Sequence, residues 1–100
     1  MLLEHRTVSR KTPRDGKLEI SAGAARRLAA IQGDVQVVLE RRRGTGALTS
    51  MTCTCRAGGE EHVHHFLTSD LFRSLRPERR VQLDLDAEAG MVLVTETDGA

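Results

Sequence analysis

The residues of this chain that are best suited to bind a metal ion lie close together. Both cysteines, Cys53 and Cys55, and three of the four histidines, His62, His64 and His65, occur within residues 53–65. Thiolate and imidazole are the ligands that structural zinc sites use, in tetrahedral sets of four. Copper(I) and iron–sulfur clusters accept the same soft donors and remain as alternatives. The segment therefore predicts a metal site, and zinc is the ion that we expect.

The spacing of these residues predicts a β-hairpin. Gly58-Gly59 is typical of a two-residue hairpin turn, because such turns need positive φ angles that glycine adopts freely. A turn centred there pairs Cys55 with His62 and Cys53 with His64. Since alternate residues of a strand share a face, all four side chains would project from one side of the hairpin. We predict that the metal ligands are Cys53, Cys55, His62 and His64.

The same register extends the two faces of the hairpin away from its turn. Met51 and Phe66 would pair on the ligand face, so that this face grades from apolar residues to metal ligands. His65 would point to the opposite face together with Val63 and Leu67. We therefore expect His65 to be a structural histidine or a support for the ligands, not a ligand itself.

A closed site of this kind favours binding over catalysis. Four protein ligands leave zinc no open position, whereas catalytic zinc needs one for water or substrate. If one histidine were not a ligand, the site would open, and Glu60 or Glu61 would be available as a base. Cys55 and His62 would also make a nucleophilic pair, but no oxyanion hole or substrate pocket is evident beside them. We expect a non-enzymatic module; the remaining alternative is two small buried cysteines beside surface histidines.

The elements that must position this hairpin occur twice in the chain. Residues 17–56 and residues 63–97 each read as a strand, a short helix, a turn, an alternating strand and a further strand. The helices are expected at residues 22–31 and 69–75. One such unit cannot bury its apolar face alone, whereas two units related by a pseudo-twofold axis could close a small barrel. The sequence thus predicts a mainly β (α+β) fold, a small barrel of two repeats with two short helices.

The composition indicates one domain with a thin core. The chain has 100 residues, no Trp, no Tyr and only two Phe. A metal clip or a second copy in a homodimer would help such a core. Residues 1–12 show no pattern, so flexibility is expected there, and they lack the apolar stretch of a signal peptide. No apolar run approaches the length of a membrane span, so we expect a cytoplasmic protein without a membrane partner.

Residues 16–40 carry a recognisable order of features. In GKLEISAGAARRLAAIQGDVQVVLE, a glycine precedes a short strand, and a helix with an arginine pair leads through Gly-Asp to an alternating strand. This order resembles the swapped-hairpin unit of AbrB/MazE-type transcription factors, and residues 63–97 resemble it more loosely. The resemblance implies a cradle-loop barrel with basic residues on one face for DNA. The matching positions are Gly16, Arg26, Arg27, Gly33 and Asp34.

The arginines suggest a second function. The net charge is only +1, but arginines cluster at the turns of both repeats. Duplicated basic turns would lie symmetrically about a pseudo-twofold axis, like half-sites on double-stranded DNA. Glu40, Asp84 and Asp86 lie close to these turns in the sequence and argue against this function. The alternative is an AbrB-like DNA-binding transcriptional regulator that contacts DNA through Arg26, Arg27, Arg41, Arg42, Arg43, Arg79 and Arg80.

Overall fold

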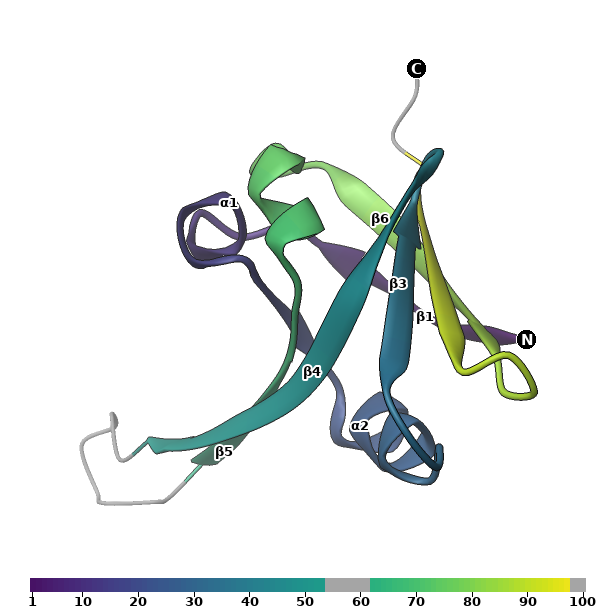
Figure 1. Cartoon of the computed structure of the whole chain (residues 1–100). Coiled ribbons are helices and arrows are strands. Elements are labelled where there is room, and N and C mark those ends of the chain that lie inside the picture. The colour runs from purple at the N-terminus through teal and green to yellow at the C-terminus, as the bar shows by residue number, and fades with distance from the viewer. Residues whose placement is uncertain (54–61, 98–100) are drawn as a thin grey trace.

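The molecule is a small curled sheet with short helices at its ends (Figure 1). The computed structural model describes residues 1–53 and 62–97. In this part of the chain, seven strands form one sheet in the order β1-β6-β7-β3-β4-β5-β2. The sheet curls into a nearly closed barrel, which confirms the mainly β fold expected from the sequence.

The helices and strands follow each other closely along the chain. Their bounds are β1 (Leu2–Thr7), α1 (Lys11–Asp15), β2 (Lys17–Ile20), α2 (Ala22–Ala29), β3 (Val35–Leu39), β4 (Arg42–Cys53), β5 (His62–Thr68), the 3-10 helix η1 (Asp70–Ser74), β6 (Arg80–Asp86) and β7 (Met91–Glu96). The two helices expected from the sequence are found as α2 and η1. No helix in the described residues has the length and apolar composition needed to cross a membrane.

The start of α2 shows why the chain turns from strand to helix at that point. The Ser21 hydroxyl accepts a hydrogen bond from the backbone N–H of Ala24 at 3.1 Å, as an N-cap residue does. The Ser21 hydroxyl also donates to the carboxylate of Glu4 on β1, and its backbone N–H donates to the same carboxylate at 3.1 Å. This contact links the end of β2 to β1, the two edge strands of the sheet.

The order strand, helix, strand, strand occurs twice, as β2-α2-β3-β4 and as β5-η1-β6-β7. The hairpins β3–β4 and β6–β7 correspond to each other, and both are antiparallel. The last strand of each unit pairs differently with the other unit. β4 pairs antiparallel with β5, whereas β7 pairs in parallel with β3. The duplication of residues 17–56 in residues 63–97 stays a prediction.

Residues 1–12, which show no pattern in the sequence, form β1 and the first residues of α1. β1 pairs antiparallel with β6, from Leu2 opposite Asp84 to Thr7 opposite Arg80. Val8 follows and is buried in the core with 1% exposure. The sequence gives little sign of β1, because an edge strand is partly exposed on both faces and does not need strict alternation.

β4 belongs to both halves of the sheet. Residues 42–46 pair with β3, and residues 47–53 pair with β5. Gly46 lies at the change of partner, where a Cβ atom would lie 2.7 Å from Val37 Cγ2 and 3.3 Å from Leu67 Cδ1. Val37 and Leu67 are completely buried. The missing side chain of Gly46 therefore allows β4 to pass close over the core and continue outward.

Beyond the barrel, β4 and β5 continue as a two-stranded ribbon, at the lower left of Figure 1. We use the name ribbon for residues 51–53 and 62–64, which pair with each other. β2 pairs with β5 only from His65 to Thr68 and does not extend along the ribbon. Met51 and Val63 of the ribbon are 52% and 56% exposed. The barrel therefore gives this segment little support. A two-stranded hairpin without such support is only marginally stable.

Candidate metal centre

The ribbon carries three of the four predicted metal ligands, Cys53, His62 and His64, but in a different register. Cys53 lies opposite His62, and Met51 lies opposite His64. The expected pairs, Cys53 with His64 and Met51 with Phe66, are therefore wrong by two residues. The expected pair of Cys55 with His62 is wrong for the same reason, because His62 lies opposite Cys53. Cys55 itself and the Gly58-Gly59 turn lie outside the described residues.

Contacts in the body of the sheet explain this register. Leu67, which is completely buried, lies opposite Leu48, and Thr68 lies opposite Ala47. Leu67 is also opposite Leu18 of β2, so its position is set from both sides. A shift of two residues leaves every side chain on its original face, so the alternation of the sequence cannot detect it. Packing of the buried end therefore decided the register, and the predicted faces were kept.

His64 is held by two neighbours on the face that was predicted to bind metal. Its Nδ1 atom lies 3.0 Å from Oε2 of Glu19 on β2, and its ring stacks on Phe66 with the centroids 6.4 Å apart. Phe66 is only 8% exposed, and the Lys17 ammonium lies 5.6 Å from the centre of the Phe66 ring. Met51 contributes to the same surface. Together these side chains form part of a cavity of about 280 Å³ between α1 and the strands β2, β4 and β5.

Arg14 and Asp15 of α1 lie on the rim of this cavity. Arg14 donates two hydrogen bonds to the Asp15 carboxylate, at 3.1 Å and 3.0 Å. These bonds lower the pKa of the Asp15 carboxyl below its usual value. The pair is exposed, so it contributes little to stability.

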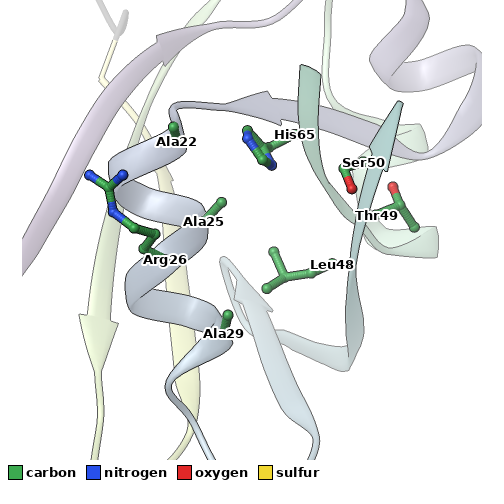
Figure 2. A pocket seen from close by; sticks show the side chains of 8 residues that line it. All are labelled: Ala22, Ala25, Arg26, Ala29, Leu48, Thr49, Ser50 and His65. Atoms are coloured by element: carbon green, nitrogen blue, oxygen red, sulfur yellow. The ribbon is translucent and has the colours of Figure 1, made fainter. Parts of the chain in front are cut away.

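His65 lies on the opposite face, as the sequence predicts. It lines a second cavity, of about 380 Å³, between α2 and the strands β4 and β5 (Figure 2). Ala25 and Ala29 of α2 face Leu48 across this space, and Ala22 lies at the end of the cavity that is nearer His65. The backbone of β5 thus separates His65 from the face that carries His64, which agrees with leaving His65 out of the ligand set.

Of the four predicted ligands, the structure describes the side chain of His64. For Cys53 and His62 the structure describes the backbone, which places the two residues directly opposite each other. Among the side chains that are described, no group of three or more His, Cys, Asp or Glu residues lies together as a metal site. Glu19 is the residue beside His64 that sequence reasoning missed. It is 45 residues away, and nothing in the sequence indicates that β2 pairs with β5.

The arginines of the DNA hypothesis are divided between two ends of the sheet. α2 precedes the start of β3, and the β3–β4 turn follows its end, so these two groups are separated by the length of β3 (Figure 1). β7 is parallel to β3 and antiparallel to β6, so β6 begins at the same end as the β3–β4 turn. One end therefore carries Arg41, Arg42, Arg43, Arg79 and Arg80, and the other carries Arg26 and Arg27.

The acidic residues near these turns in the sequence are partly distant in space. Asp86 is at the far end of β6 from Arg80, and six residues of strand at roughly 3.3 Å each separate them by roughly 20 Å. Asp84 is two residues nearer. Glu40 does lie in the β3–β4 turn beside Arg41. Glu78 beside Arg79 and Glu96 opposite Val81 also lie at the end that carries Arg41, so acidic residues accompany the arginines there.

No family model matches the chain, and no curated protein matches it.

Proposed function

We propose that this chain is a small non-enzymatic binding module that binds one zinc ion through Cys53, Cys55, His62 and His64. The observation that supports this most is the ladder, in which residue 53 lies directly opposite residue 62; His64 lies two positions along β5, opposite Met51. Opposite residues of an antiparallel pair have Cβ atoms roughly 5 Å apart. This separation suits two side chains that reach one ion with bonds of roughly 2.0–2.3 Å.

The position of the ribbon gives a physical reason for a metal ion there. Residues 62–64 pair only with β4, and Met51 and Val63 are more than half exposed. Little apolar burial holds the two strands together there. A metal ion bound between β4 and β5 would supply the missing stabilisation. The site is absent in the unfolded chain, so the free energy of metal binding adds to the free energy of folding. The cytoplasmic location expected from the sequence would keep both thiols reduced and available.

The test is metal analysis of freshly reduced protein together with thermal unfolding. We expect about one zinc ion per chain, and a melting temperature that falls on chelation and at acid pH, where protons compete for thiolate and imidazole. Cobalt substitution should give thiolate and ligand-field bands on a near-ultraviolet background that lacks Trp and Tyr. If the metal analysis finds copper instead of zinc, the proposed ligands stand and only the identity of the ion changes.

Two ligand variants and one matched control make this test specific. Cys53→Ser and His64→Ala should abolish the cobalt bands. His65→Ala should leave them nearly intact, because His65 lines the cavity on the other face. Stoichiometry well below one ion per chain with no cobalt spectrum would defeat the proposal, and the cysteines would then be small strand residues beside surface histidines.

A specific observation also favours a second candidate, the DNA-binding regulator. Arg41, Arg42 and Arg43 are exposed and lie at the same end of the sheet as Arg79 and Arg80. Arginines gathered at one end suit the phosphates of double-stranded DNA, and each neutralised phosphate releases a counterion. Binding should therefore weaken steeply as the salt concentration rises.

The second candidate is tested by gel shift with random and AT-rich duplexes at low salt. Replacement of Arg41, Arg42 and Arg43 by Ala should flatten the dependence of affinity on salt. Replacement of Arg26 and Arg27 by Ala is the matched control, because these residues lie at the other end of β3 and should contribute little. The absence of a shift at low salt would exclude this function.

A further inference from the structure

We propose that Glu19 is a positioning residue for metal binding, whose carboxylate holds Nδ1 of His64 so that the imidazole presents Nε2 to the ion. This inference rests on the proposed metal function. It adds β2, which lies outside the predicted hairpin, to the metal site.

The contact defines which nitrogen of His64 is free. Nδ1 lies 3.0 Å from Oε2 of Glu19. An ionised carboxylate can only accept a hydrogen bond, so the proton of neutral His64 resides on Nδ1. The lone pair of Nε2 is then available to a metal ion. Carboxylates commonly hold metal-binding histidines in this way, and they fix both the tautomer and the orientation of the ring.

A second contact restricts the ring before any ion arrives. The imidazole of His64 stacks on Phe66, with 30° between the two planes. Phe66 is buried, and it lies opposite Glu19 in the β2–β5 ladder. The backbone pairing of β2 with β5 therefore places both supports of His64 at once. The ring is held on one edge by a hydrogen bond and on one face by an aromatic side chain.

The imidazole and the carboxylate are both partly open to solvent. The His64 side chain is 39% exposed and that of Glu19 is 44% exposed. Both line the cavity of about 280 Å³ beside the ribbon. Partial exposure also means that a change at Glu19 removes little packing, so the effect on metal binding can be separated from the effect on folding.

The experiment measures zinc affinity by competition with a chromophoric chelator. Glu19→Ala should weaken zinc binding by roughly ten- to a hundredfold, the loss found when such supporting groups are removed. Glu19→Gln should lose less, because its amide oxygen still accepts the hydrogen bond from Nδ1. Glu88→Gln, an exposed change in the β6–β7 turn away from the ribbon, is the matched control and should leave affinity unchanged.

A second readout reports on the tautomer directly. In metal-free wild-type protein, at a pH where imidazole is neutral, nitrogen NMR should show the proton of His64 on Nδ1, and Glu19→Ala should lose this preference. The inference is overturned if the wild type carries the proton on Nε2, or if Glu19→Ala binds zinc as tightly as the wild type. Failure of the wild type to bind zinc would instead overturn the proposed function, and the inference with it. Should Glu19→Ala not fold, Glu19→Gln and the wild-type tautomer still decide between these outcomes.

Discussion

Gly46→Ala tests whether β4 needs a close approach to the core where it changes partner. The new Cβ atom would lie 2.7 Å from Val37 Cγ2, a distance at which something must shift. Val37 is completely buried and has little room to move, and overpacking of this kind costs about 1–3 kcal/mol. Replacing Gly by Ala also restricts the unfolded chain, which offsets about 0.4–1 kcal/mol. We expect a net loss of about 1–2 kcal/mol, or roughly 5–15 °C in melting temperature for a chain of this size.

The measurement is thermal and denaturant unfolding followed by far-ultraviolet circular dichroism. Gly44→Ala is the graded control, because its Cβ would lie 3.2 Å from Cγ of the half-buried Leu71, which can shift. Val37→Ala removes the clashing methyl group, so in that background Gly46→Ala should cost almost nothing. The coupling energy between the two changes should be about 1–2 kcal/mol. Equal costs in both backgrounds would refute the close-packing explanation.

Three further predictions concern the N-terminal quarter of the chain. Thr12 is completely buried and its hydroxyl has no hydrogen-bond partner among the described residues, so Thr12→Val should stabilise the protein by about 1 kcal/mol; an unchanged or lower denaturant midpoint would contradict this. Ser21→Ala removes the N-cap of α2 and its bonds to Glu4, and calorimetry should show a loss of about 1 kcal/mol, whereas an unchanged melting temperature would show that the cap is dispensable. Asp15 has a lowered pKa because Arg14 donates hydrogen bonds to it, so its small contribution to stability is present above the unfolded-state pKa and is lost as pH falls through the folded-state pKa. Arg14→Gln should return that pKa towards its usual value in an NMR titration, and an identical titration curve would count against the pairing.

Alternation in the sequence was sufficient to predict the mainly β fold. Val35, Val37 and Leu39 are buried in turn along β3, as period-two patterns require. The same holds for β6, where Val81 and Leu83 are completely buried. Such patterns report which face of a strand is buried, but they carry no information on which strand lies beside it. The parallel pairing of β3 with β7 could not be predicted for that reason.

The candidate site shows the same limit more sharply. The separation of His64 from His65 on opposite faces follows from alternation alone and is confirmed by the two cavities that they line. The partner across the ladder does not follow, because the register depends on the packing of Leu67 in the body of the sheet. The contact of Glu19 with His64 depends on a long-range pairing, and no local signal marks it.

The placement of β1 and β2 has a consequence for synthesis of the protein on the ribosome. These strands are made first, yet their partners are β6 and β5, which are made much later. Residues 1–20 must therefore wait, unpaired, until most of the chain has emerged. Leu18 and Ile20, buried in the finished protein, are then exposed to water and to other nascent chains. β1 therefore waits longest of the described strands for its partner, because β6 follows it by more than seventy residues.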